Sequence, residues 1–383
     1  MAYKHSNCVS FAGPSTLIHE CGHACWPRGP ALRGFITLRH QQNCAHRAGA
    51  IFRIALFAIA LVGCFGGSPQ SDEPELMTIL RGHGERALSI AISADCQTLA
   101  SGCSDGTVRV WDLETAELRF SLTEHTDLCS GLGFSPNGKI LATGSEDVKL
   151  WESATGRILC SFAHGPRVMT TQFSPDGKIL ATEIQQGSAK LWDVETRQLR
   201  ATLRGYEGSL TPGLAFSPDG KFLATASLHE AFPNLPKLWS PVTGEPLAKF
   251  QGEEVSPRCL SFSPDANTLA VGMWHGCNVR LFDVRSRTDR GSLTHWCPIS
   301  QVAFWPDGKT LAVAGSLGRY GRPPEVVLWD LPSGKQLRVF QPHPSKAPLF
   351  DTNFSVQAFS PDGKLWATGC ADNTIKLWRL STD

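Results

Sequence analysis

The sequence predicts an all-β fold made of seven repeated four-stranded units. A phrase that reads Phe-Ser-Pro-Asp-Gly, or a variant of it, begins at seven positions: Ile92, Phe134, Phe173, Phe216, Phe262, Phe304 and Phe359. Seven residues after each start comes an apolar residue followed by Ala, as at Leu99 and Leu141. Each copy ends on an aromatic residue, 40 to 49 residues after the last one: Trp111, Trp151, Trp192, Trp239, Phe282, Trp329 and Trp378. Periods of this length indicate a repeat architecture.

Each copy is expected to contain four strands. Pro and Gly in Ser-Pro-Asp-Gly fit a type I turn, which joins two strands as a hairpin. A half-buried strand such as 139–143 follows, and a third strand such as 108–111 alternates with a period of two. A fourth runs through 198–203 and its equivalents. Four strands in 40 to 50 residues are typical of a propeller blade, so we predict a seven-bladed β-propeller.

The two ends of the repeat region are expected to close the ring. The sequence ends just past the third strand of copy seven, which leaves that blade without its outer strand. Residues 76–80, before the first complete copy, have the pattern of such a strand. We therefore predict that they complete the last blade and remove two free sheet edges. Residues 76–383 form one propeller domain on this interpretation.

The repeats resemble the WD-repeat β-propeller family over roughly residues 76–383. The Trp-Asp pair that names the family stands at 111–112, 192–193 and 329–330, and the family's Gly-His stands at 82–83. The resemblance implies the propeller fold and, by default, interaction with other proteins or peptides. Fold alone carries little information about function.

Two copies share a set of polar residues with a common spacing. The sets are His83, Ser101, Asp105 and Trp111 in the first copy, and His343, Thr368, Asp372 and Trp378 in the last. Ser, His and Asp could form a hydrolase triad. Recurrence in separate copies instead indicates architecture, and in the resembled family these positions form a hydrogen-bonded network inside the blade. We therefore expect no catalytic residue here.

Insertions enlarge several loops between the second and third strands or between blades. Antiparallel pairing places both kinds of loop on the same face of the ring. The insertions and a neighbouring loop bring Arg, aromatic and His side chains, which are typical of interaction hot spots. We expect a protein-binding face made of His229, Phe232, Trp274, His275, Arg319, Tyr320 and Arg322.

The segment before the repeats resembles an export signal. The longest apolar run spans 54–65, too short for a comfortable bilayer crossing but suited to a signal peptide. Its end, Leu61-Val62-Gly63-Cys64, resembles the lipobox of bacterial lipoproteins, so Cys64 is the expected lipidation site. Residues 46–63 would be the signal and 64–75 a flexible tether. The alternatives are an uncleaved membrane anchor at about 49–67, or no export.

Residues 1–45 fit none of these elements. A signal peptide usually starts nearer its cleavage site, so this leader is either disordered or the product of a misassigned start, with Leu38 one alternative. The leader contains His19, Cys21, His23 and Cys25, followed by a further Cys-x-His at 44–46. Zinc ligands are usually more widely spaced, so we expect no metal site.

Charge and missing motifs exclude several functions. Residues 71–383 contain 30 basic and 34 acidic side chains, a net of −4, so we expect no nucleic-acid partner. Nucleophile-elbow, phosphate-loop and zinc-protease motifs do not accompany the polar set, so we expect neither an enzyme nor a cofactor. The eight cysteines beyond Cys64 are expected mainly as buried thiols, with one disulfide left open.

The predicted function is a non-enzymatic interaction scaffold, tethered to the membrane of the cell envelope through lipidated Cys64. Two alternatives remain open at this point. One is a cytoplasmic or membrane-anchored WD-repeat regulatory scaffold. The other is an enzyme or ligand-binding propeller that uses its central channel.

Overall fold

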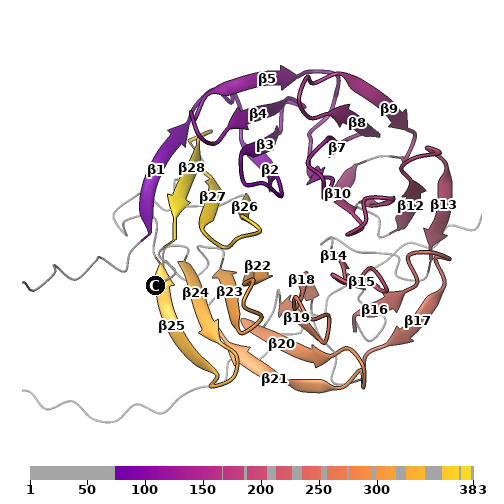
Figure 1. The fold of residues 1–383 in the computed structure, drawn as a ribbon, viewed down its shortest axis with the longest axis vertical. Coiled ribbons are helices and arrows are strands. Elements are labelled where there is room, and N and C mark those ends of the chain that lie inside the picture. Colours follow the sequence, from indigo (N-terminus) through magenta and orange to yellow (C-terminus); the bar gives the residue numbers. More distant parts are fainter. Residues whose placement is uncertain are drawn as a thin grey trace, which may run out of the picture. The chain divides into compact units, whose positions relative to one another are not determined.

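The computed structural model describes most of the repeat region. The described residues are 74–165, 167–184, 188–204, 213–226, 235–251, 257–273, 276–295, 299–315, 325–340, 356–370 and 372–380. All of them belong to the second of two compact units, Gly67–Asp383. They form seven four-stranded antiparallel sheets, each a blade of a ring (Figure 1). This confirms the predicted seven-bladed β-propeller.

Six blades are built from four consecutive strands, ordered from the ring centre outwards. Blade 1 comprises β2 (Ala87–Ile92), β3 (Thr98–Cys103), β4 (Val108–Asp112) and β5 (Leu118–Leu122). Blade 2 comprises β6 (Gly131–Phe134), β7 (Ile140–Gly144), β8 (Val148–Glu152) and β9 (Ile158–Phe162). Blade 3 comprises β10 (Val168–Phe173), β11 (Ile179–Ile184), β12 (Ala189–Asp193) and β13 (Leu199–Leu203).

The remaining blades follow the same order. Blade 4 comprises β14 (Gly213–Phe216), β15 (Leu223–Ala226), β16 (Lys237–Trp239) and β17 (Pro246–Lys249). Blade 5 comprises β18 (Pro257–Phe262), β19 (Thr268–Met273), β20 (Asn278–Asp283) and β21 (Asp289–Thr294). Blade 6 comprises β22 (Ile299–Phe304), β23 (Thr310–Gly315), β24 (Glu325–Asp330) and β25 (Lys335–Phe340). Blade 7 comprises β26 (Val356–Phe359), β27 (Leu365–Gly369), β28 (Ile375–Arg379) and β1 (Glu75–Leu80).

The N-terminal strand closes the ring as the sequence predicts. β1 pairs antiparallel with β28, with Leu76 opposite Trp378 and Leu80 opposite Ile375. It begins at Glu75, the last residue assigned above to the tether. Leu80 is 1% exposed and belongs to an apolar cluster shared by blades 7 and 1. Closure is therefore a packing interaction as well as a hydrogen-bonded edge.

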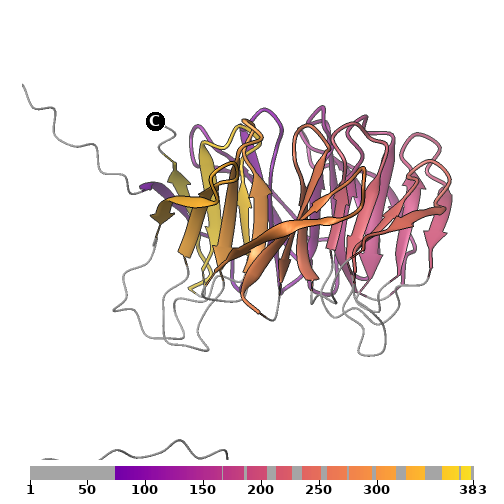
Figure 2. The ribbon, with the colours of Figure 1, turned by 90° about the horizontal axis from the view of Figure 1, so that it is seen from below.

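The repeated Ser-Pro-Asp-Gly phrase forms the turn between the first two strands of a blade. In blade 3, Gly177 N donates to Ser174 O at 2.8 Å, which closes the turn, and Gly177 has a φ of 72°. The Asp176 carboxylate accepts from the Ser174 hydroxyl and from the Lys178 N–H. These tight turns lie on one side of the ring, at the top in Figure 2. Side chain and backbone together fix each hairpin, which explains why the phrase recurs.

Apolar packing between neighbouring blades accounts for the other two repeated signatures. Seven buried clusters are found, and each joins residues of two adjacent blades. In every cluster the closing aromatic of one blade packs with the second-strand Ala of the preceding blade. Trp151 with Ala100 and Phe282 with Ala224 are examples. A small residue such as Ala leaves room in this closely packed cluster for the next blade's aromatic side chain.

The Asp after the closing aromatic ties the outer strand to its neighbour. Asp112 accepts hydrogen bonds from the N–H groups of Glu114 and Thr115, and its other oxygen pairs with Arg119 at 2.5 Å. The same pairing joins Asp193 with Arg200 and Asp283 with Arg290. The name-giving dipeptide is therefore a turn cap and a strand clamp, on the face opposite the strand ends that lead into the second-to-third loops.

Candidate functional site

The seven residues predicted to form a binding face lie outside the described residues. These are His229, Phe232, Trp274, His275, Arg319, Tyr320 and Arg322. The structure describes the strand ends that flank the second-to-third and inter-blade loops. In blade 1 Val108 pairs with both Gly102 and Leu122, so the second-to-third loop and the exit to the next blade leave from the same edge. The flanking strands thus agree with the single face expected from the topology.

The polar set of blade 1 forms a closed network around Ser101. Its hydroxyl oxygen lies 2.6 Å from His83 Nε2 and accepts from Trp111 Nε1 at 2.9 Å. Arg109 Nη1 lies 2.7 Å from His83 Nδ1. A guanidinium can donate but cannot accept, so Nδ1 is the acceptor and the ring proton sits on Nε2, facing Ser101. Burial, and then the Arg109 charge, lower the pKa of His83 to about 4.

Asp105 has a different role from the one a triad would require. Its Oδ1 accepts from the backbone N–H of Thr107 at 2.9 Å and from the Thr107 hydroxyl at 2.6 Å, so it caps the turn between β3 and β4. Arg109, which the sequence analysis did not select, holds the position beside His83 Nδ1. Ser101 is 0% exposed, which keeps its hydroxyl out of reach of a substrate.

Blade 7 contains the same pair of Trp and hydroxyl. Trp378 Nε1 donates to Thr368 Oγ1 at 3.1 Å, and Asp372 caps its turn by accepting from the N–H and hydroxyl of Thr374. His343, the fourth member predicted from sequence, lies outside the described residues.

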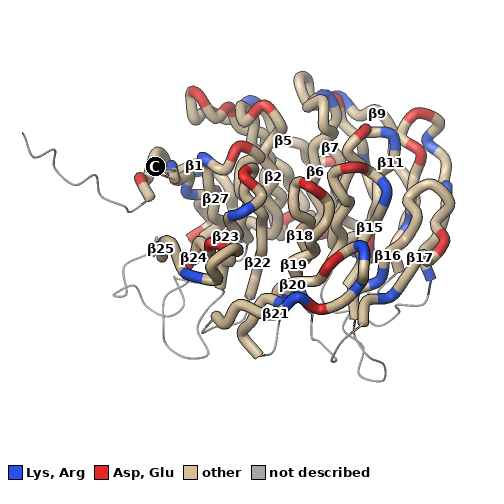
Figure 3. The backbone as a smooth tube through the Cα atoms, turned by 60° about the horizontal axis from the view of Figure 1, so that its bottom comes forward, with Lys and Arg blue, Asp and Glu red and all other residues tan. Residues whose placement is uncertain are grey.

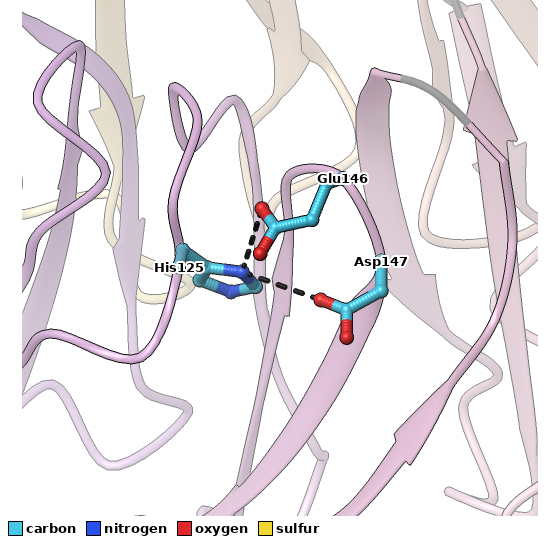
Figure 4. A group of neighbouring side chains, drawn as sticks. All are labelled: His125, Glu146 and Asp147. Carbon is cyan, nitrogen blue, oxygen red and sulfur yellow. Dashed lines mark ion pairs between the residues drawn. The ribbon is translucent and has the colours of Figure 1, made fainter.

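Blade 2 contains a network that the sequence analysis did not single out. His125 Nε2 lies 2.6 Å from Thr143 Oγ1, and Trp151 Nε1 donates to the same oxygen at 2.8 Å. Two carboxylates lie beside the other ring nitrogen: Glu146 Oε2 and Asp147 Oδ1 are each 3.4 Å from Nδ1 (Figure 4). The sequence contains these polar residues, but the segment from the second strand to the closing Trp is two residues shorter in copy 2 than in copies 1, 3 and 7. The spacing of the polar set therefore differs from that of the first and last copies.

His125, Glu146 and Asp147 are the group of side chains that could hold a metal ion among the described residues. The group already has a cation. Lys149 Nζ lies 2.6 Å from Asp147 Oδ1 and 3.6 Å from Glu146 Oε1. A metal ion would have to displace this ammonium group, which already offsets one of the two carboxylate charges, so the cluster fits a structural network better than a metal centre.

The network is less complete in blades 3 and 6. Trp192 and Trp239 still donate to Thr182 and Thr225, at 2.8 Å each. In blade 3, however, neither ring nitrogen of buried His164 has a partner among the described residues, and burial lowers the pKa of His164 to about 4. In blade 6 Val313 replaces the hydroxyl, and the buried Trp329 Nε1 likewise lacks a partner there.

Glu183 is an ionisable side chain in an apolar junction. It is 0% exposed on β11, beside Gly213 of blade 4. The equivalent residue is Gly or Ala in the other six blades: Gly102, Gly144, Ala226, Gly272, Ala314 and Gly369. Neither carboxyl oxygen has a hydrogen bond of normal geometry within the described residues. Burial raises the pKa of Glu183 well above its ordinary value, and the nearby Gly213 N–H opposes this to a smaller extent.

Within the described residues no helix is long and apolar enough to cross a membrane. Seven cysteines there are free thiols, and burial raises the pKa of the fully enclosed Cys129 to about 12. Such a thiol is inert as a nucleophile at neutral pH.

Seven such blades, with the Trp-Asp clamp and the buried His–hydroxyl–Trp network, define a WD-repeat β-propeller. Comparison with known families assigns the chain to one family of such propellers. Residues 89–379 match the family described as the first β-propeller of IFT122, so the chain belongs to that family.

Individual relatives come from several kinds of protein. The chain is 28% identical over 301 residues to apoptotic protease-activating factor 1 of Rattus norvegicus, covering 76% of this chain and 22% of that protein. It is 26% identical over 326 residues to angio-associated migratory cell protein of Homo sapiens, covering 80% and 70%. It is 27% identical over 283 residues to pre-mRNA-processing factor 19 of Oryza sativa subsp. japonica, covering 66% and 51%.

We expect Glu183 to make the protein less stable as pH rises. The unfolded chain releases this proton near the ordinary glutamate pKa of about 4.5, whereas the folded protein retains it to higher pH. Stability therefore falls above that pH by up to about 1.4 kcal/mol per pH unit, until the folded group also ionises. Glu183→Gln keeps the size but removes the titration. Urea unfolding across a pH series measures the difference.

Glu245→Gln, an exposed change in blade 4, serves as the control. Parallel stability curves for the wild type and Glu183→Gln would show that Glu183 is not held protonated by the blade junction.

Proposed function

We propose that this protein is a non-enzymatic scaffold that binds other proteins on the face carrying the second-to-third and inter-blade loops. The observation that carries the proposal is the contrast between the two faces. The turns on one face repeat the same capped geometry from blade to blade. The loops that differ between copies join strands at the other face. A rigid ring with one variable face is suited to positioning binding loops.

The polar residues of the blades support a structural rather than a catalytic role. Ser101 and Thr143 are each 0% exposed, and each already accepts a hydrogen bond from a Trp indole and lies 2.6 Å from a His Nε2. The low pKa of His83 results from burial and Arg109 and keeps the ring neutral. The net charge of −4 over residues 71–383 favours a protein partner over a nucleic acid.

We further propose that the scaffold is tethered at the cell envelope through Cys64. The support is the sequence alone: an apolar run at 54–65, small residues before Cys64, and a Gly, Ser and Pro-rich stretch behind it. A tether of this composition behaves as a flexible chain. It would hold the propeller near the membrane while leaving its loop face free.

The binding face is tested by replacing Arg319, Tyr320 and Arg322 with Ala. Hot-spot Arg and Tyr side chains contribute about 2 kcal/mol or more each, so we expect at least a tenfold loss of capture of envelope proteins. Quantitative mass spectrometry of proteins retained on the immobilised chain gives the readout. Lys139→Ala, Arg157→Ala and Ile158→Ala together form the control, since these residues lie in tight turns and an outer strand of blade 2. If the triple variant of Arg319, Tyr320 and Arg322 captures the same proteins as the wild type, these residues do not form the binding surface.

The tether is tested by intact-mass and N-terminal peptide analysis of the native protein from fractionated cells. We expect a mature chain that begins at lipid-modified Cys64, and a Cys64→Ser variant that stays unprocessed. A native chain that retains residues before Cys64 contradicts the lipoprotein proposal and favours an anchored or cytoplasmic scaffold.

A further inference from the structure

A groove lies between blades 4 and 5, on the face of the tight turns. Its volume is about 390 Å³, within the range of small-ligand and peptide pockets. Apolar side chains from both blades line it, including Phe222, Leu238, Leu247 and Val284. Leu247, on the outer strand β17, is 48% exposed. The groove therefore offers a partly open apolar surface at a junction that is otherwise packed.

Two arginines of the β20–β21 turn stand at this groove. Arg285 and Arg287 line it, both are exposed, and neither guanidinium has a hydrogen bond or ion pair among the described residues. Figure 3 shows basic positions, with acidic ones beside them, near β20 and β21. The Arg287 carbonyl accepts from Gln251 N at 2.8 Å, which fixes the turn against blade 4.

The acidic side chains of the groove are already engaged. Asp265 accepts from the Ser263 hydroxyl and the Asn267 N–H. Asp219 accepts from the Ser217 hydroxyl and pairs with Lys221 at 3.1 Å. Asp219 is balanced by Lys221, whereas Asp265 keeps its negative charge, so the two guanidiniums leave the lining with a net charge of +1. A carboxylate is the natural partner of an unpaired arginine.

Arg287 occupies a backbone position that favours glycine. Its φ is 63°, and its N–H donates to Asp283 O across the turn. The equivalent turns of blades 2, 4 and 6 use Gly156, Gly244 and Gly334, with φ of 72°, 75° and 65°, whereas blades 1 and 3 have Ala116 and Arg197, with φ of 59° and 61°. A side chain at this left-handed position costs conformational energy that glycine avoids. Arg287 and its blade 3 counterpart Arg197 both accept this cost.

We propose that this groove binds a short acidic segment of a partner protein, with an apolar side chain on the floor around Leu247 and carboxylates on Arg285 and Arg287. The chain's own leader does not fit this chemistry, because residues 1–70 contain six basic side chains and one acid. The site is separate from the loop face of the proposed function, so the two can be tested independently.

The test is fluorescence polarisation of the whole propeller with labelled ten-residue peptides. The first peptide carries Glu and Asp beside a Leu-Phe pair. The others replace its acids with Gln and Asn, replace its acids with Lys, or replace Leu-Phe with Ser. We expect binding of the first peptide alone, weaker at high salt because exposed charges are screened.

Variants then locate the site. Arg285→Glu and Arg287→Glu should each lower the affinity at least tenfold, and Leu247→Asn should lower it several-fold. Lys335→Glu, the same charge change beside the corresponding turn of blade 6, and Leu118→Asn, an exposed leucine of blade 1, should leave it unchanged. All five positions are exposed, and unchanged unfolding midpoints confirm that each variant folds.

Three results would overturn the proposal. One is no binding of the acidic apolar peptide at concentrations up to about 1 mM. Another is equal binding of the Gln/Asn or the Ser peptide, or competition by inorganic phosphate alone, which would indicate a simple anion site or an unspecific apolar contact. The third is unchanged affinity after all three groove substitutions. Substitution of Arg319, Tyr320 and Arg322 tests binding at the loop face. Its outcome does not change the interpretation of the peptide measurements at the groove.

Discussion

The contact between a closing aromatic and the alanine of the preceding blade is the interaction on which the structure depends. A single four-stranded blade cannot bury both of its faces, so each must be covered by a neighbour. Trp151 on Ala100 and Phe282 on Ala224 show the arrangement, which recurs at every junction. Because β1 completes blade 7 and its Leu80 joins the cluster shared with blade 1, the chain closes as a ring rather than as an open stack.

The polar network is secondary to this packing. Where it is complete, as around Ser101 and Thr143, it satisfies the indole N–H and the histidine buried above the aromatic contact. Where it is incomplete, as around His164 and Trp329, the apolar cluster still forms. The network therefore uses polar groups that the fold already buries, and it leaves no reactive hydroxyl exposed in these two copies.

The fold could be predicted almost completely, whereas the site could be predicted only in part. Seven copies in register specify seven blades, and residues 76–80 specify closure, because both are local patterns. Arg109 beside His83 was missed because a basic residue in a strand is usually a solvated one. Glu183 was missed because it reads as an ordinary strand residue until the copies are superposed and its six equivalents prove to be Gly or Ala. The groove could not be predicted, since it joins residues some sixty positions apart on two blades.

The central claim is that burial at the blade 7–blade 1 junction holds the ring closed, and Leu80 tests it most directly. Urea unfolding should show that Leu80→Ala lowers the free energy of unfolding by about 2–5 kcal/mol, because it empties a fully packed position. Met77→Ala, on the same strand but 37% exposed, should change it by about 0.5 kcal/mol or less. Equal, small effects of the two substitutions would contradict the account, because the ring would then be stable without the closing strand's core.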